Sequence, residues 1–408
     1  MLVLSYDFGL KPEILSPAGD MERLVAAVKF GADAVYLAGQ EFGMRTSPNN
    51  FTLDELVKAV SFAHENNVKV YLTCNTLPRN NEIDRLPEFI QNATQAGVDA
   101  YIVADIGVLQ LVKKYAPNVD VHISTQAGVV NYLTAQTFYD MGAKRVVLAR
   151  ELTLDDIATI RAKTDKNLEL EVFVHGSMCV SFSGRCLLSS YLTGRDANRG
   201  DCAQPCRWKY NLVEENRNGQ FFPVYEANDG TYFLNSRDLC MINHIPDVVK
   251  AGATSLKIEG RAKSAYYVAV TTNAYKQALN LFWENKPFEP WLAEELDKIS
   301  HREYNTGFFF GNEPGQVYSN GGYIRNYDVV AVCEGYKNGM MEISQRNKFF
   351  KCDVLDILEP GAKSFELKVE KIFDEWGNEV DSTPHAMQKL FIPTEKKVLP
   401  GALLRKKK

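Results

Sequence analysis

The 408-residue sequence lacks the long apolar runs that membrane proteins carry. No stretch of about 18 consecutive apolar residues occurs, so we expect no transmembrane helix. The N-terminus lacks a basic segment followed by an apolar stretch and a small-residue cleavage site, so we expect no signal peptide. These two absences predict a cytoplasmic protein that does not enter a membrane, and in that compartment cysteine thiols stay reduced.

Several short catalytic and nucleotide-binding motifs are also missing. The sequence contains neither the H-E-x-x-H motif of zinc peptidases nor the G-x-S-x-G motif of serine hydrolases. No G-x-G-x-x-G follows the first predicted strand, which removes support for a dinucleotide-binding fold. The formal net charge of −5 argues against a protein coated in positive charge, although a local basic groove for nucleic acid stays compatible with it.

What the sequence does contain, from residue 12 onward, is a repeated short β-like run followed by a helical pattern. Several of the helical segments open on Asp or Thr, which cap helix N-termini well. Eight strands alternating with helices over about 260 residues are typical of a closed (β/α)8 barrel of the TIM type, with an open doubly wound sheet as the alternative. The predicted strands lie at residues 12–18, 33–39, 68–75, 99–105, 119–126, 144–150, 168–176 and 254–260.

Polar residues alternate with apolar residues along several of these strands. Because successive side chains point to opposite faces, the apolar set should pack under the helices and the polar set should point into the lumen. Either a ligand cavity or an internal network of ion pairs would satisfy the polar set. We favour a ligand site, because these residues reach the C-terminal strand ends, where barrel enzymes place their chemistry. The main lumen-facing positions are Lys69, Asn75, His122, Gln126, Glu171, His175, Lys257, Glu259 and Arg261.

The division into domains follows from where this pattern is interrupted and where it ends. Residues 1–310 are predicted to form the barrel, with residues 177–253 as a long insertion between the seventh and eighth strands. Long insertions after a barrel strand are where active sites are elaborated. From residue 325 short alternating strands separated by turns predict a small antiparallel β-barrel over residues 325–408.

Five of the eight cysteines lie in the insertion, and their spacing leaves more than one chemistry open. Only Cys202 and Cys206 approach the close spacing of a zinc-binding pair. Four thiolates from one loop-rich insertion would suit an iron–sulfur cluster, which requires no fixed spacing. A nucleophilic cysteine with His175 as its partner is a third interpretation, but it leaves the other cysteines unexplained. The five are Cys179, Cys186, Cys202, Cys206 and Cys240.

A resemblance to a known family bears on this choice. The stretch EVFVHGSMCVSFSGRCLLS (171–189) reads Glu-x-Phe, two residues, Gly, a small residue, an aliphatic residue, Cys, four residues, Gly-x-Cys, then x-aliphatic-Ser. This pattern resembles the signature of the peptidase U32 family. The similarity extends through ILSPAGDMERLVAAVKFGADAVYLAG, TGRDANRGDCAQPCRWKY and KIEGRAKSAYY, and therefore over nearly the whole chain.

The resemblance has implications for the cofactor that the protein holds and for the reaction that it catalyses. Some members of the family are assigned as collagenase-type peptidases, whereas other branches resemble oxygen-independent hydroxylases that hold a [4Fe-4S] cluster. The sequence is most similar to the branch that uses prephenate to make 5-hydroxyuridine at the tRNA wobble position. In the resemblance, the cluster ligands correspond to Cys179, Cys186, Cys202 and Cys240, with Cys206 as an alternative fourth ligand.

A dicarboxylate such as prephenate needs cationic partners, and charge-assisted hydrogen bonds from guanidinium groups are the strongest of these. We expect Arg261 and Lys257 of the eighth strand, with Arg150 at the end of the sixth, to bind it. Asn75 and Gln126 are further candidates for binding the substrate because they end the third and fifth strands.

Two further groups of residues are predicted to act on the substrate or to bind RNA. Glu259 and His175 are candidates for proton transfer, although Glu259 could instead serve only as an ion-pair partner. Bases could stack on Trp208, and Arg195 or Arg199 could contact phosphate.

The leading hypothesis is therefore a cluster-dependent tRNA hydroxylase that works with a homologous partner subunit or an electron donor. A peptidase is the main alternative, and hydroxylation of another substrate such as ribosomal RNA is a second. A third is an RNA-binding assembly factor that hands its substrate to a separate catalyst and holds a structural cluster.

Overall fold

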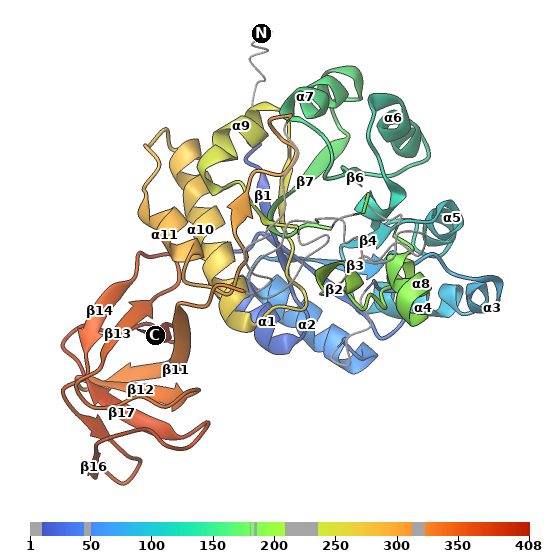
Figure 1. The fold of residues 1–408 in the computed structure, drawn as a ribbon. Helices are drawn as coiled ribbons and strands as arrows, with labels where there is room; N and C mark the ends of the chain where they lie inside the picture. The colour runs from blue at the N-terminus through green and yellow to red at the C-terminus, as the bar shows by residue number, and fades with distance from the viewer. Residues whose placement is uncertain (1–9, 45–49, 180, 183–185, 209–235, 312–322) are drawn as a thin grey trace, which may run out of the picture.

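The structure is a computed structural model, and it describes residues 10–44, 50–179, 181–182, 186–208, 236–311 and 323–408. These residues form a barrel of parallel strands surrounded by helices, followed by a C-terminal antiparallel β domain (Figure 1). Within the described ranges, no helix has both the length and the apolar character needed to cross a membrane.

The eight predicted barrel strands are all present. Neighbours along the chain pair in parallel, and the last strand pairs with both the first and the seventh, which closes the barrel. The closed (β/α)8 architecture is thus confirmed, and the doubly wound alternative is wrong. The strands are β1 (Glu13–Pro17), β2 (Ala34–Ala38), β3 (Lys69–Cys74), β4 (Ala100–Val103), β5 (Asp120–Ile123), β6 (Arg145–Val147), β7 (Glu169–Ser177) and β9 (Ser255–Ile258).

The helices pack around the strands and begin at capping residues that the sequence supplies. Thr52 and Thr153 each form a capping box with the acidic residue three positions on, which satisfies backbone N–H groups of the first turn. Around the barrel run α1 (Met21–Lys29), α2 (Leu53–Glu65), α3 (Asn80–Ile83), α4 (Leu86–Gln95), α5 (Ile106–Tyr115), α6 (Tyr132–Asp140), α7 (Leu154–Lys163), α9 (Ile245–Lys250) and α10 (Ala265–Trp283).

The predicted two faces of the strands are observed. In β3, Val70, Leu72 and Cys74 belong to the large core that the strands share with the helices. On the opposite face, Tyr36 and Tyr71 belong to a small separate apolar cluster inside the lumen.

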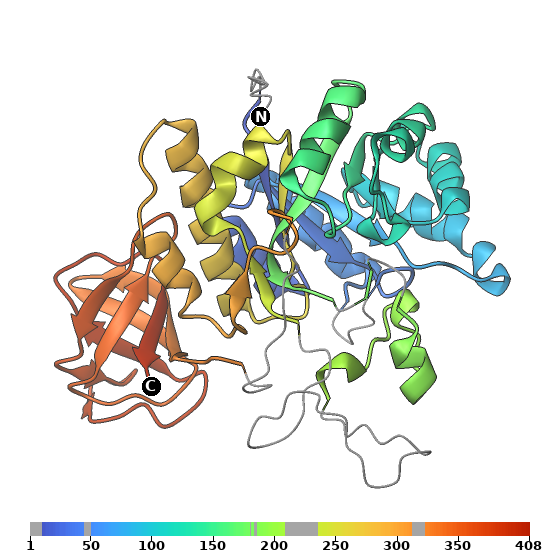
Figure 2. The ribbon, with the colours of Figure 1, turned by 45° about the horizontal axis from the view of Figure 1, so that its top comes forward.

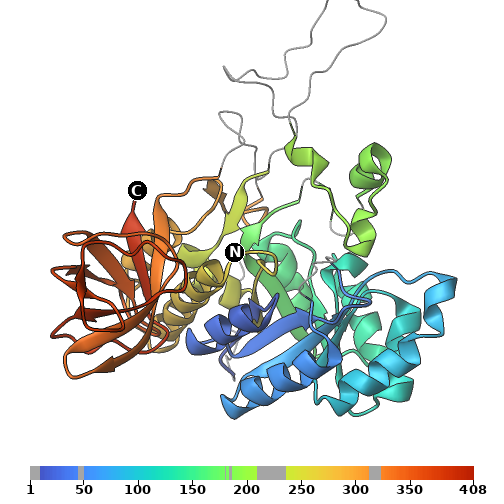
Figure 3. The same ribbon diagram turned by 90° about the horizontal axis from the view of Figure 1, so that it is seen from below.

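The link between β7 and β9 contains more regular structure than we predicted. It includes α8 (Leu188–Thr193), the short 3-10 helices at Ala197–Arg199 and Pro205–Arg207, and β8 (Asp238–Cys240). The β8 strand pairs antiparallel with the end of β7 and parallel with β10 (Tyr304–Asn305). Helix α9 is the barrel's own last connecting helix, so the insertion into the barrel ends before it. Figure 3 shows α8 at one end of the barrel.

The C-terminal residues fold into one curled antiparallel sheet with its own apolar core, as predicted. Figure 2 shows this domain beside α10 and α11 (Trp291–Leu296). Its strands are β11 (Tyr327–Lys337), β12 (Met340–Gln345), β13 (Val354–Leu358), β14 (Phe365–Lys368), β15 (Ile372–Phe373), β16 (Glu379–Val380), β17 (Lys389–Pro393) and β18 (Leu403–Lys407).

A buried ion pair joins the C-terminal domain to the barrel. Arg405 of β18 is fully buried and donates to Glu295 of α11 at 2.7 Å and to Asp356 of β13 at 2.6 Å. On α10, the Asn273 side chain accepts a hydrogen bond from the Gly361 backbone N–H at 2.9 Å. These contacts hold the C-terminal domain against the helices α10 and α11.

The lower half of the lumen, at the N-terminal ends of the strands, is filled by buried charges. Glu171 of β7 is fully buried and accepts from the Lys257 ammonium at 2.6 Å and from the Arg145 guanidinium at 3.0 Å. Arg145 also binds Glu13 and Glu169. Burial favours a higher pKa for Glu171, but Lys257 and Arg145 outweigh it and hold this pKa below its ordinary value. An internal ion-pair network, one of the two predicted arrangements, thus occupies this part of the lumen.

We predict that Glu171→Gln lowers the free energy of unfolding by about 3 kcal/mol, because it leaves the buried Lys257 ammonium without its carboxylate. A urea titration followed by circular dichroism measures the change. Glu284→Gln is the matched control, because Glu284 pairs with Lys286 at 2.6 Å on the exposed surface and should leave stability unchanged. Equal stability of the two variants would contradict the structural role of the network.

Candidate functional site

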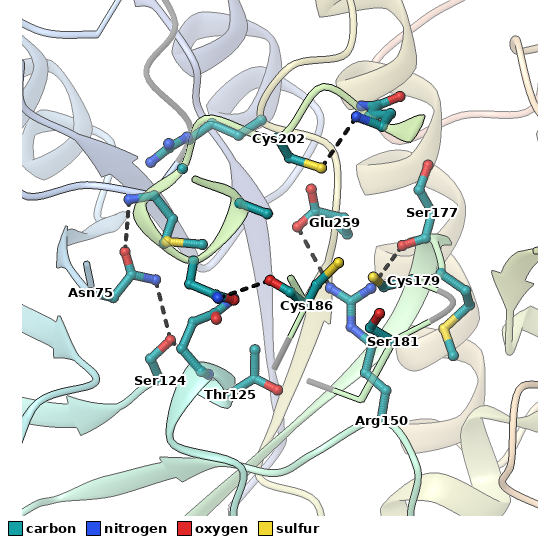
Figure 4. A pocket seen from close by; sticks show the side chains of 18 of the residues that line it. Asn75, Ser124, Thr125, Arg150, Ser177, Cys179, Ser181, Cys186, Cys202 and Glu259 are labelled. Atoms are coloured by element: carbon teal, nitrogen blue, oxygen red, sulfur yellow. Dashed lines mark hydrogen bonds and ion pairs between the residues drawn. The ribbon is translucent and has the colours of Figure 1, made fainter. Parts of the chain in front are cut away.

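A pocket of about 390 Å³ lies above this network, at the C-terminal ends of the barrel strands. Residues from β2, β3, β7 and β9, from the turns after β5 and β6, and from the insertion line it (Figure 4). Lys257 lies at its floor, since the same side chain belongs to the ion-pair network below. The second predicted arrangement, a cavity at the mouth of the lumen, is therefore also present.

Four insertion cysteines line this pocket, namely Cys179, Cys186, Cys202 and Cys206. Asn198 donates to the Cys186 carbonyl at 2.9 Å, and the Gln204 backbone N–H donates to the Cys202 sulfur at 3.3 Å. Burial raises the pKa of the Cys179 thiol, and the neighbouring Cys186 and Cys202 thiols also raise it. The insertion thus gathers thiols from separate turns at one mouth of the barrel.

The thiols of this pocket match an iron–sulfur cluster by donor type. Among the residues that the structure describes, no three His, Cys, Asp or Glu side chains are arranged around a single metal ion. Four cysteine thiolates are, however, the donor set that holds a [4Fe-4S] cluster, whose irons are bound one by each sulfur. The donor set fits, and the cluster stays a prediction.

The fifth insertion cysteine lies elsewhere. Cys240, in β8, does not line the pocket and stands opposite His175 in the β7–β8 pairing. Its sulfur accepts a hydrogen bond from the Tyr275 hydroxyl at 3.8 Å, and burial raises its pKa to about 11. The two alternatives for a fourth ligand thus occupy different places, because Cys206 lines the pocket and Cys240 does not.

His175 does not face the lumen, and our prediction that it does is wrong. The pairing of β7 with β9 is irregular between Phe173 and His175, and this irregularity breaks the alternation of faces. The imidazole is buried beside the rings of Tyr267, Tyr275 and Tyr304, with ring centroids 5.4–5.8 Å apart. Burial lowers the pKa of His175 to about 3, so it is neutral and does not reach a substrate in the pocket.

A glycine of the resemblance motif shapes this junction. Gly176 has a φ of +113°, a region that favours glycine, and a Cβ there would lie 2.5 Å from the Glu259 carbonyl oxygen. The end of β7 can therefore approach the residue that follows β9 only because residue 176 has no side chain.

Arg150 and Glu259 lie together in the pocket, as Figure 4 shows. The Arg150 guanidinium donates to the Ser177 carbonyl at 2.7 Å, lies 3.8 Å from the Glu259 carboxylate and packs over the Phe173 ring at 3.8 Å. Glu259 also accepts from the Tyr36 hydroxyl at 3.4 Å. The guanidinium is thus held in place by groups on both β7 and the loop after β9.

The other predicted substrate-binding residues of the strands also line the pocket. Arg261 donates to the Thr73 hydroxyl at 3.1 Å, and Asn75 donates to Ser124 at 3.2 Å. Gln126 lies at the same rim. Lys257 lines the pocket as well, but its ammonium is already paired with the Glu171 carboxylate, so its charge is neutralised within the lumen network.

The residues predicted to bind RNA are only partly brought together. Arg195 lines the pocket and pairs with Asp201 at 2.7 Å. Arg199 pairs with Glu82 outside the pocket lining, and Trp208 is 45% exposed and also outside it.

Two uncharged pocket residues, Tyr36 and Ser177, were not among the predicted site residues, whereas Thr73 was predicted to share the inward face of its strand with Asn75. Tyr36 and Thr73 line the pocket from β2 and β3, and Ser177 lines it from the end of β7. Tyr36 occupies an inward position of β2, so the alternation that identified Thr73 and Asn75 could also have identified this residue.

Comparisons with known proteins agree with this architecture. Residues 19–318 match the family model of Peptidase family U32, and residues 325–405 match the model of the Peptidase family U32 C-terminal domain. The tRNA hydroxylation protein P1 of Bacillus subtilis is 38% identical over 406 residues, which cover 98% of this chain and 95% of that protein.

Two other relatives bear different names. A 23S rRNA 5-hydroxycytidine synthase of Escherichia coli is 36% identical over 75% of this chain and 46% of its own length. A collagenase of Porphyromonas gingivalis is 31% identical over 95% of this chain and 96% of its own length. From the two family matches and from these identities, the chain belongs to peptidase family U32.

Proposed function

We propose that this chain is an iron–sulfur-dependent, oxygen-independent RNA hydroxylase that forms 5-hydroxyuridine at the tRNA wobble position in the cytoplasm, with prephenate as co-substrate. The observation that carries the proposal is the gathering of four thiols in one pocket at the mouth of the polar lumen. The names of the Bacillus and Escherichia relatives support RNA hydroxylation as the reaction class.

The cofactor follows from the chemistry. Hydroxylation of an unactivated uracil carbon requires redox chemistry that side chains lack, and a bound [4Fe-4S] cluster would supply one-electron chemistry. Cys179, Cys186 and Cys202 would hold it, with Cys206 as the fourth ligand because it lines the same pocket. Conversion of the uracil C5–H bond to C5–OH removes two electrons from the base, and prephenate, as the co-substrate, would take them up. A homologous partner subunit or an electron donor would set the oxidation state of the cluster.

The remaining pocket residues fit a small anionic substrate. A cavity of about 390 Å³ falls within the usual range for small-molecule sites, and guanidinium groups bind carboxylates in a bidentate manner. Arg150 is oriented by Ser177 and Glu259 before any ligand arrives, which reduces the entropic cost of binding. Glu259 is the ionisable group placed to exchange a proton with a substrate that Arg150 and Arg261 hold.

A peptidase is the second candidate, because the Porphyromonas collagenase is similar over nearly the whole chain. A cysteine nucleophile needs a base within hydrogen-bonding reach. No histidine is among the described residues that line the pocket, and His175 is buried among tyrosines instead. The geometry therefore favours redox chemistry over peptide hydrolysis.

We predict that Cys206→Ser abolishes iron binding and that Cys240→Ser retains it, because only Cys206 lies with the other thiols. Iron and acid-labile sulfide per chain are measured after anaerobic purification. Cys352→Ser, at an exposed thiol of the C-terminal domain, is the control and should bind iron as the wild type does. Loss of iron in Cys240→Ser with retention in Cys206→Ser would assign the fourth ligand to β8.

We also predict that deleting the gene removes 5-hydroxyuridine from tRNA, as measured by mass spectrometry of nucleosides. The wild-type gene and the Cys352→Ser variant should restore the modification, whereas Cys179→Ser should not. Unchanged 5-hydroxyuridine after deletion would remove the tRNA assignment. Hydroxylation of unmodified tRNA by the purified protein separates a catalyst from an assembly factor.

A further inference from the structure

A second, smaller cavity of about 140 Å³ opens beside the pocket. Ser177, Gln204 and Glu259 line both cavities, so the smaller one is a side chamber of the larger. Lys263 and Tyr323 line only the side chamber. Neither residue was a candidate in the sequence analysis, and neither has a role in the chemistry proposed above.

The side chamber lies where barrel proteins commonly bind phosphate. Ser177 ends β7, the seventh barrel strand, and residues 259–263 follow β9, the eighth. The loops after the seventh and eighth strands form the phosphate sites of many (β/α)8 barrels. Helix α10 begins at Ala265, directly after this loop, and the positive end of its dipole adds to an anion-attracting field.

Within the described part of the chain, no carboxylate lies within ion-pair distance of the Lys263 ammonium, and Asp238, whose pKa the Lys263 charge helps to lower, pairs with Arg302 instead. The contacts of Lys263 are the faces of two rings, Tyr323 at 4.4 Å and Tyr267 at 5.4 Å from the ammonium nitrogen. Two other cations at this end of the barrel do lie next to a carboxylate: Arg150 lies beside Glu259, and Arg195 pairs with Asp201. A cation that borders a cavity and has no direct ion pair among the described residues is suited to binding an anion.

Beside the side chamber, the chain segment that contains Tyr323 and Arg325 runs from the pocket rim into the C-terminal domain. The ring of Tyr323 lies under the Lys263 ammonium, and the Arg325 guanidinium approaches the same ring at 5.9 Å. Arg325 is exposed and precedes β11, the first strand of the C-terminal domain. Two cations and an aromatic ring therefore follow one another from the pocket rim, an arrangement typical of surfaces that bind single-stranded nucleic acid.

We propose that the side chamber binds a backbone phosphate of the RNA strand next to the nucleotide whose base enters the pocket, with Lys263 as the cation that contacts it. Tyr323 and Arg325 flank the continuing strand. The inference rests on the proposed function, because a base can enter the pocket only if its adjoining phosphates remain at the rim. It adds to that function a subsite for the polynucleotide, separate from the subsite for the small co-substrate.

The test uses an anticodon stem-loop RNA with an unmodified wobble uridine, bound to the full-length protein at several salt concentrations and followed by fluorescence anisotropy. Lys263→Met, which removes the charge and keeps the chain length, should weaken binding about tenfold. It should also reduce the slope of log K against log salt by roughly 0.7–0.9, the contribution of one phosphate contact. Lys263→Arg should restore both, because it keeps the charge.

Lys114→Met is the matched control. Lys114 also packs over a tyrosine ring, Tyr115, but lies at the C-terminal end of α5 on the exposed surface, and its removal should change neither affinity nor slope. Iron content and the midpoint of thermal unfolding should stay at wild-type values in every variant, which separates an RNA contact from a folding defect.

Three results would overturn the inference. Wild-type affinity and slope in Lys263→Met would show that the side chamber holds no phosphate. Unchanged RNA binding with weaker binding of prephenate would assign the chamber to a carboxylate of the co-substrate. Failure of the wild-type protein to bind the stem-loop would remove the proposed function along with the subsite, a result distinct from the other two.

Discussion

The buried pairing of Glu171 with Lys257 and Arg145 is the interaction on which the rest of the barrel depends. A barrel with so many inward charges is stable only if each is compensated, and here Glu171 pairs with Lys257 and shares Arg145 with Glu13 and Glu169. The network fills the part of the lumen at the N-terminal strand ends and neutralises the Lys257 charge, so the lumen is open only at the C-terminal strand ends, where the pocket lies. Among the cations that line the mouth, Arg150 and Arg261 lie at the ends of barrel strands, where they are placed to meet a substrate.

The crossing of β7, β8 and β9 decides which reactive groups reach that mouth. Gly176 lets β7 approach the Glu259 backbone, and the irregular pairing just before it turns His175 toward the tyrosines of α10. The insertion that follows β7 places four cysteine thiols in the lining of the pocket at the C-terminal strand ends. The same junction therefore keeps an imidazole base out of the pocket and leaves cysteine thiols at its mouth, an arrangement that fits the proposed redox site better than a hydrolytic one.

Sequence alone predicted most of the fold and part of the site, for physical reasons. Alternation along the strands placed Thr73 and Lys257 inward, because side chains of a regular strand take opposite faces. Asn75, Glu259 and Arg261 also line the pocket, but from positions just past the ends of β3 and β9. The same rule failed for His175, since an irregularity in strand pairing leaves no mark in the sequence. Strand β8, at three residues, is too short to show a period. Cysteine spacing likewise could not show that Cys206 lines the pocket and that Cys240 does not, because spacing along the chain does not tell where a thiol lies in the fold.

The central claim is that the pocket thiols hold a [4Fe-4S] cluster beside the substrate. It is tested most directly by the absorption spectrum of the anaerobically purified wild-type protein, together with its iron and acid-labile sulfide content. We expect a brown protein with about four irons and about four sulfides per chain, as one such cluster requires. A colourless protein that contains zinc, or no metal, would contradict the account.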